Sequence, residues 1–182
     1  MEGPNHVEFT MKKKEDAGIR LKRLVIFVLC ILPFFIITSI LMIAAQQFIV
    51  ITAPVIILTI LMCIYTKRFT RLEYEYVVQS GELNVAVIYD NVSRRNLIKD
   101  AKISEMHKVV PYATNEPLLK APEINKVLYY CSDLENPDLY VAIFDDAKRG
   151  RVAVVFNASR KLVQVMKFYN SMNTIVKNDF QY

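Results

Sequence analysis

Across Leu24–Tyr65 the chain contains no Asp, Glu, Lys or Arg, and only Gln46 and Gln47 interrupt the apolar run near its middle. A helix of about twenty residues, rising 1.5 Å per residue, crosses a hydrocarbon layer of roughly 30 Å. The run is too long for one such crossing and long enough for two. The sequence therefore predicts a transmembrane helical hairpin, with spans at Leu24–Ala45 and Phe48–Tyr65.

Two other interpretations of this run are weaker. A cleaved signal peptide also has a basic leader and an apolar stretch, but here the stretch is too long and a second apolar segment follows within a few residues. A buried hairpin in a soluble protein is disfavoured because neither segment has a polar face.

Positive charge flanks both outer ends of the predicted hairpin, whereas the turn Ala44–Phe48 carries no charge. The flanking residues are Lys12, Lys13, Lys14, Arg20, Lys22 and Arg23 before it, and Lys67, Arg68 and Arg71 after it. The positive-inside rule places both flanks in the cytoplasm. We therefore expect a multi-pass protein of the inner (plasma) membrane with both termini cytoplasmic.

The hairpin predicts three parts: a cytoplasmic head at residues 1–23, the hairpin at 24–65 and a cytoplasmic domain at 66–182. The tail is long enough to bury its own core, and the head is not. Cys30 and Cys63 fall in the apolar run, and Cys131 stands alone in the tail without a CxxC motif or Cys/His cluster. No metal, cofactor or disulfide is expected, and the unpaired cysteine fits a reducing compartment.

The tail shows the period-two alternation of strands, separated by polar turns such as Gln79–Glu82 and Asp146–Gly150. The predicted strands are Leu72–Val78, Leu83–Tyr89, Arg94–Lys99, Val127–Ser132, Leu139–Asp145 and Arg151–Phe156. Ala101–Lys108 predicts one or two helical turns, and Val109–Asn125 is expected to be irregular because three prolines interrupt it.

A final helix is predicted after Asn157 or Ser159, either of which can cap it. Its apolar face repeats at helical spacing: Leu162, Val165, Met166, Tyr169, Met172 and Val176. The predicted fold class is α+β: an N-terminal transmembrane α-hairpin, then a small barrel or sandwich of six or seven antiparallel strands closed by a C-terminal capping helix.

This order resembles bacterial pleckstrin-homology-like (PH-like) domains, and more closely an uncharacterised family of two-span membrane proteins from Gram-positive anaerobes. The resemblance covers about Lys67–Tyr169. It rests on Leu72-Glu73-Tyr74-Glu75-Tyr76, Gly81-Glu82-Leu83-Asn84, Ile88-Tyr89, Arg94-Arg95-Asn96-Leu97-Ile98 and Val154-Val155-Phe156-Asn157. It implies a curved antiparallel barrel or sandwich capped by the helix, with no catalytic residues to transfer.

Catalytic signals are weak in this chain. His107 is the only histidine of the tail, with Asp100 and Glu105 as nearby candidates to orient it. The pair Asp145 and Asp146 could suggest acid/base chemistry, but its position before a Lys-Arg-Gly sequence favours a solvated hairpin tip. The sequence also lacks a phosphate-binding glycine loop and a nucleophile elbow.

Basic residues give the better candidate site. Residues 67–182 hold 17 Lys and Arg residues against 14 Asp and Glu, an excess too small to indicate nucleic-acid binding. Local basic clusters fall at predicted strand ends: Arg94, Arg95, Lys148, Arg149 and Arg151. In PH-like folds loops at the open end often hold anionic head groups, so these five residues are the candidate lipid-binding residues.

Three functions follow from these patterns. The leading prediction is a membrane-anchored, non-enzymatic cytoplasmic interaction or scaffold module of unknown partner, for which an anionic lipid and another membrane-associated protein are the candidates. The alternative is binding of an anionic lipid head group through the basic clusters. The third is an enzyme with its site in the Pro111–Pro122 loop.

Overall fold

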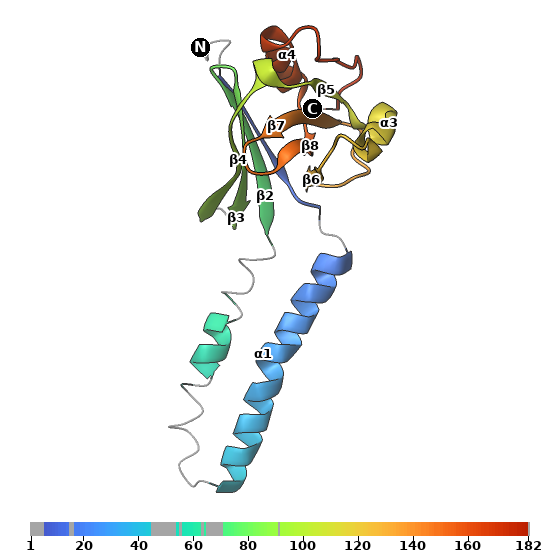
Figure 1. The fold of residues 1–182 in the computed structure, drawn as a ribbon. Coiled ribbons are helices and arrows are strands. Elements are labelled where there is room, and N and C mark those ends of the chain that lie inside the picture. The colour runs from blue at the N-terminus through green and yellow to red at the C-terminus, as the bar shows by residue number, and fades with distance from the viewer. Residues whose placement is uncertain are drawn as a thin grey trace. The chain divides into compact units, whose positions relative to one another are not determined.

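A computed structural model of the chain describes residues 6–14, 17–44, 54, 56–62, 64, 71–90 and 92–181 (Figure 1). The chain divides into two units. The first, here called the β-domain, joins Met1–Lys14 to Glu73–Tyr182. The second, here called the inserted segment, is Glu15–Leu72. The β-domain is therefore built from two stretches of chain that the apolar region separates.

The first sheet of the β-domain has four strands in the order β1-β2-β3-β4. Their bounds are β1 (His6–Lys12), β2 (Leu72–Gln79), β3 (Glu82–Tyr89) and β4 (Ser93–Lys102). Tyr74, Tyr76 and Val78 alternate along β2 and are buried, as the period-two pattern predicts. The β2–β3 turn contains Gly81 at φ +83°, a backbone conformation that glycine adopts readily.

Strand β1 differs from the sequence prediction. The prediction treats residues 1–23 as a head outside the domain, whereas His6–Lys12 forms an edge strand antiparallel to β2, from His6 opposite Gln79 to Lys12 opposite Glu73. Its side chains belong to the core as well: Val7 is buried, and the ring of Phe9 stacks 6.1 Å from that of Tyr76. A short strand cannot fold alone, but it can complete a sheet whose other strands come later in the chain.

The second sheet has the order β5-β7-β8-β6. Its strands are β5 (Lys108–Pro111), β6 (Lys126–Tyr130), β7 (Leu139–Asp146) and β8 (Gly150–Asn157). The strands predicted around residues 127, 139 and 151 are confirmed. The prediction of purely antiparallel strands is wrong, because β6 pairs with β8 in parallel. β5 also forms within the region predicted to be irregular; its Pro111 ends the strand.

The region between β5 and β6 holds two short helices, α3 (Tyr112–Asn115) and η2 (Glu116–Lys120). Leu118 and Leu119 from η2 and Tyr112 from α3 pack on the second sheet, against a cluster that includes Val141 and Val155. The opposite face of this sheet carries Tyr140 and Phe156, whose ring centroids lie 6.5 Å apart. The sheet is thus covered on both faces, which explains the unbroken apolar sequence of β7 and β8.

The two sheets contact each other through Tyr76. Its ring lies 5.9 Å from that of Phe156 on β8, and its hydroxyl donates a 2.6 Å hydrogen bond to the carbonyl oxygen of Tyr130 on β6. The described strands nevertheless form two separate hydrogen-bonded sheets. Of the predicted alternatives, a closed barrel is therefore wrong, and the described strands form two packed sheets.

Helix α4 (Arg160–Tyr169) follows β8. Ser159 caps it, since its hydroxyl oxygen accepts a hydrogen bond of 3.3 Å from the backbone N–H of Leu162. The helix ends earlier than predicted, because Asn170 leaves helical geometry at φ −143° and ψ 73°. Its side-chain amide donates instead to the carbonyl oxygens of Ile103 and Met106, at 2.9 and 2.8 Å.

The inserted segment contains helix α1 (Ala17–Ala44), which begins before the predicted span. Residues Ala17–Ile40 form one helix long and apolar enough to cross a membrane, judged by length and composition. Of the second predicted span, residues 56–62 are helical and mostly exposed; most of the rest of Phe48–Tyr65 lies outside the described residues. The hydroxyls of Thr38 and Ser39 donate to backbone carbonyls one turn earlier in α1.

Candidate functional site

The first two predicted lipid-binding residues lie near the start of β4, on the first sheet. The Nη2 atom of Arg94 is 2.7 Å from Oε2 of Glu75, a residue that is only 7% exposed. Burial raises the pKa of the Glu75 carboxyl group, and the charge of Arg94 opposes that shift. Arg94 is therefore engaged by a carboxylate of its own sheet, whereas Arg95 is exposed.

The other three predicted residues lie at the β7–β8 turn, on the second sheet. Asp146 shapes this turn, because its Oδ1 atom accepts hydrogen bonds from the backbone N–H groups of Lys148 and Arg149, at 2.7 and 3.1 Å. Arg151 pairs with two carboxylates, Asp145 at 3.1 Å and Glu123 at 2.8 Å. Contacts among the described residues do not bring this group together with Arg94 and Arg95.

His107 has a partner that sequence proximity missed. Its Nε2 atom lies 2.9 Å from Oδ2 of Asp145, not beside Asp100 or Glu105. Hydrogen bonds from His107 and Arg151 lower the pKa of Asp145 below its usual value. Both side chains of the pair are well exposed, at 42% and 59%. The pairing of β5 with β7 brings His107 beside Asp145. Strand β5 is not predicted from the sequence, which therefore could not reveal this contact.

The geometry of this His–Asp pair does not favour catalysis. The pair continues through Arg151 to Glu123, so the side chains of His107, Asp145, Arg151 and Glu123 form a connected polar chain at the surface. In the part of the chain that is described, hydroxyl or thiol groups are not seen bonded to His107, and no group of three His, Cys, Asp or Glu residues could hold a metal ion. An exposed network of this kind supplies surface electrostatics, not an activated nucleophile.

Cys131 is equally unsuited to nucleophilic chemistry. It is a free, buried thiol, and burial raises its pKa to about 11. The reactive form of cysteine is the thiolate, which is scarce at neutral pH for such a group.

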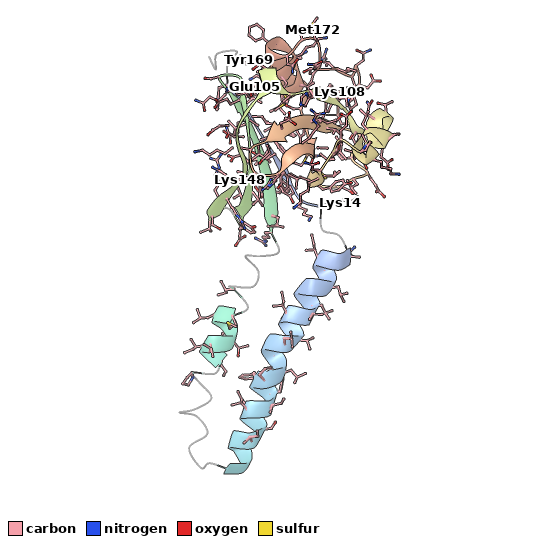
Figure 2. The ribbon with its side chains drawn as sticks, in the orientation of Figure 1. Lys14, Glu105, Lys108, Lys148, Tyr169 and Met172 are labelled. Atoms are coloured by element: carbon pink, nitrogen blue, oxygen red, sulfur yellow. The ribbon has the colours of Figure 1, made fainter. Side chains whose placement is uncertain are left out.

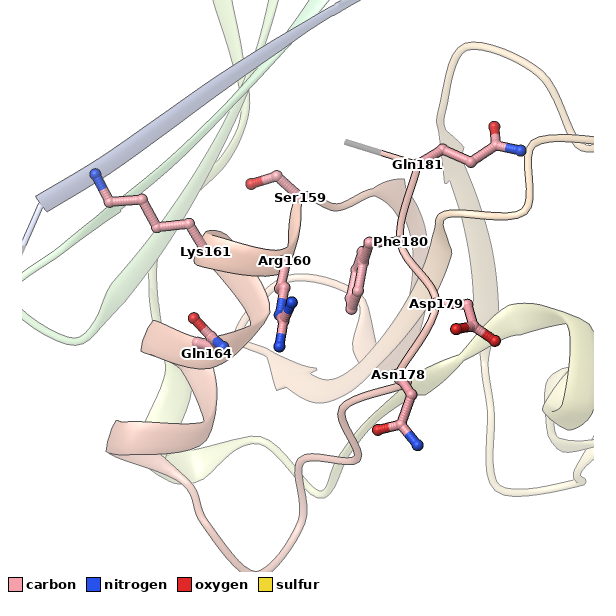
Figure 3. Close-up of a pocket in the computed structure, with 8 residues that line it drawn as sticks. All are labelled: Ser159, Arg160, Lys161, Gln164, Asn178, Asp179, Phe180 and Gln181. Carbon is pink, nitrogen blue, oxygen red and sulfur yellow. The ribbon is translucent and has the colours of Figure 1, made fainter.

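A cavity of about 590 Å³ lies between the start of α4 and the C-terminal tail. Figure 3 shows Arg160 beside the ring of Phe180, with Gln164 on the same helix, while Asp179 and Gln181 point away. The residues that line the cavity do not come from the Pro111–Pro122 loop, where the sequence places the candidate enzyme site. Its lining includes the cationic groups of Arg160 and Lys161, the hydroxyl of Ser159 and side-chain amides, which can bind polar groups.

The C-terminal tail that lines this cavity is attached to the second sheet. Phe180 stacks on Tyr140 with ring centroids 5.9 Å apart and planes inclined by 7°. Lys177 forms an ion pair with Asp138, which is 1% exposed, and its ammonium group lies 4.9 Å from the centroid of the Phe180 ring. These contacts hold the tail in place, so that its residues 178–181 can form one wall of the cavity.

Two packed sheets followed by a C-terminal helix define the class: a small PH-like β-domain. Residues 5–176 match the family described as "Bacterial PH-like domain (DUF6106)", and the chain belongs to that family. The match includes the residues of β1 and confirms the resemblance to bacterial PH-like domains. No curated protein and no solved structure matches the chain.

Proposed function

We propose that this chain is a membrane-anchored, non-enzymatic interaction module: a PH-like domain held at the cytoplasmic face of the membrane by a two-span hairpin. PH-like domains generally act by binding, and the described residues contain no nucleophile paired with a base. The apolar helix α1 supplies the anchor. A fold shared with other proteins does not by itself establish a function, so the proposal rests on the way the anchor is inserted into the domain.

The observation that carries the proposal is the pairing of β1 with β2 across the inserted segment. Lys12 precedes the segment and Glu73 follows it, yet they are neighbours in one sheet. Both must therefore lie on the same side of any membrane that the segment enters. If α1 crosses, the chain must cross back before Glu73, which supports two spans independently of the charge pattern.

Reporter fusions test this topology. A reporter that works only in the cytoplasm should be active ahead of Met1 and after Tyr182, and one that works only outside should be active between Gln46 and Gln47. The protein should also stay in membranes during alkaline washing. An external C-terminus, or release by the wash, would contradict the proposal.

A second candidate function is contact with anionic lipid through Arg94 and Arg95. Arg94 pairs with Ile88, near the end of β3. Arg94 and Arg95 therefore lie at the end of the first sheet that also holds Lys12 and Glu73, where the inserted segment is joined to the sheet. Each basic residue near an anionic surface contributes roughly 1 kcal/mol. Val92, in the adjoining turn, is 72% exposed and could enter the head-group layer.

A spin label at Val92 in the full chain, reconstituted in nanodiscs, tests this contact. The label should lose mobility in discs with anionic lipid compared with neutral discs. Arg94→Glu with Arg95→Glu should abolish the difference. The matched variant Lys148→Glu with Arg149→Glu, on the other sheet, should leave it intact. Equal mobility in both lipids would show that the two arginines do not bind lipid.

A further inference from the structure

The segment at the end of α4 exposes large apolar side chains. Met172 is 95% exposed, Phe168 78% and Ile175 56%. We call these three residues the distal patch. Single exposed apolar residues are common on protein surfaces, but three in one short segment indicate an interaction site when the segment is held in place.

Hydrogen bonds and ring contacts hold this segment on both sides of Met172. The Asn170 side chain donates to the carbonyl oxygens of Ile103 and Met106. The backbone N–H of Val109 donates to the carbonyl oxygen of Asn173 at 2.8 Å, and that of Ile175 donates to the carbonyl oxygen of Val109 at 2.9 Å. Next to Phe168, the ring of Tyr169 packs directly over the backbone of Gly81.

This anchoring makes the distal patch pre-organised. A partner that binds it need not order the loop, so less conformational entropy is lost on association. Phenylalanine and methionine are also enriched at protein–protein interfaces. Met172 is 95% exposed, so its side chain buries little apolar area in the folded domain and is available for contact with a partner.

The distal patch lies far from the attachment of the inserted segment. Tyr169 contacts Gly81 in the β2–β3 turn, and the preceding Gln79 pairs with His6 at the start of β1. The chain leaves the sheet at the other end, after Lys12. A strand of this length spans on the order of 20 Å. Figure 2 shows Met172 and Tyr169 at the end of the β-domain opposite Lys14.

The charges around the distal patch select the kind of partner. Lys108 precedes Val109 and Lys167 precedes Phe168; both are exposed, and neither has an ion pair within the described residues. The carboxylate of Glu105 is 2.9 Å from the ammonium group of Lys102 and is therefore compensated. An apolar surface flanked by two unpaired lysines complements apolar side chains flanked by carboxylates.

We propose that Phe168, Met172 and Ile175, with Lys108 and Lys167, form the docking surface for an acidic amphipathic segment of a cytoplasmic protein. This inference rests on the proposed function as an interaction module and names its surface and partner class. Apolar side chains of the segment cover Met172 and Phe168, and its carboxylates pair with the two lysines.

Site-specific photocrosslinking of the full chain in its native membranes tests the proposal. A benzophenone amino acid replaces Met172 in one variant and Leu134 or Val92 in control variants. Crosslinked peptides are sequenced by mass spectrometry. From position 172 we expect a protein segment with an apolar face and acidic flanks. Lys108→Glu with Lys167→Glu should lower this crosslink about tenfold, whereas Lys126→Glu should not change it.

Several results would overturn the proposal: no crosslink from position 172, a crosslink to lipid or to a second copy of this chain, a segment without acidic residues, or equal yield after charge reversal. Unchanged thermal unfolding of each variant shows that the fold is retained.

Crosslinks to protein from positions 92 or 134 but not from 172 would disprove this docking surface and leave the proposed interaction module supported. Absence of protein crosslinks from all three positions would count against both.

Discussion

At the scale of single residues, the ion pair of Asp138 and Lys177 shows how the tail is held. The carboxylate is buried and also accepts a 2.8 Å hydrogen bond from the backbone N–H of Gln181. The same lysine donates to the carbonyl oxygen of Pro137 at 2.8 Å. A buried charge that loses its partner is costly, so the tail beyond the family match is energetically part of the domain.

We predict that Lys177→Met lowers the free energy of unfolding by about 2–4 kcal/mol, because it leaves the Asp138 carboxylate buried without its counter-ion. Adding Asp138→Asn should restore part of the loss, since the neutral amide no longer needs the charge. Denaturant unfolding of the two single variants and the double variant measures the coupling. The exposed Lys126→Met serves as control, and a loss equal to that of the control would refute the pairing.

The pH response of Cys131 is a second prediction at the residue scale. Its pKa is raised from 9.0 to about 11, so the folded state holds the thiol proton more tightly than the unfolded state does. The resulting stabilisation is fully present below pH 9 and disappears as pH rises through 11.

In a variant with Cys30→Ser and Cys63→Ser, iodoacetamide should alkylate native Cys131 slowly at pH 8, with only about one thiol in a thousand ionised. Alkylation should accelerate in denaturant, where the thiol recovers its ordinary pKa. Rapid alkylation of the native protein at pH 8 would mean that the thiol is not buried.

At the scale of elements, β1 decides whether the β-domain can exist as a fragment. Without it, β2 becomes an open edge, Tyr76 loses the ring of Phe9, and the buried Val7 is missing. An exposed edge strand of this kind promotes aggregation.

We therefore predict that residues 71–182 alone will be unfolded or aggregated, whereas residues 6–14 joined to 71–182 by a short Gly-Ser linker will be soluble and folded. A short linker suffices because Lys12 and Glu73 are paired neighbours. Cooperative thermal unfolding distinguishes the two chains. Equal stability of both would show that β1 contributes nothing.

The helical and strand elements also show where local sequence signals succeed. Strands β2, β3, β7 and β8 follow the alternating or continuous apolar patterns, and Ser159 caps α4 as predicted. The end of α4 was not predictable, because Asn170 is drawn out of the helix by carbonyl groups of Ile103 and Met106, far away in sequence. Local periodicity carries no information about such long-range acceptors.

At the scale of the whole molecule, the apolar segment is an insertion between two neighbouring strands of one sheet. The chain therefore has to bring β1 to β2 after the whole inserted segment has been made. That order makes the N-terminal residues part of the domain and places the two ends of the insertion side by side. The distal patch lies at the end of the first sheet opposite the strand ends to which the insertion is joined.

The candidate sites divide in the same way. The basic clusters can be recognised in the sequence. Only the structure shows that Arg94 forms an ion pair with Glu75, and that Arg151 forms ion pairs with Asp145 and Glu123. The contact of His107 with Asp145 and the exposure of Met172 were likewise invisible, since both depend on which strands pair. Lipid binding by the five basic residues stays a prediction, and the proposed lipid contact uses two of them, Arg94 and Arg95.

What the sequence determined by itself was the apolar run, its charged flanks and most strands of the tail, because hydropathy and period-two alternation act over neighbouring residues. Only the tertiary structure decided that His6–Lys12 joins the sheet, that β6 runs parallel to β8, and that Met172 stays outside the core. These features depend on free energies gained between segments far apart in the chain, where a short sequence is compatible with several partners and the packed core selects one.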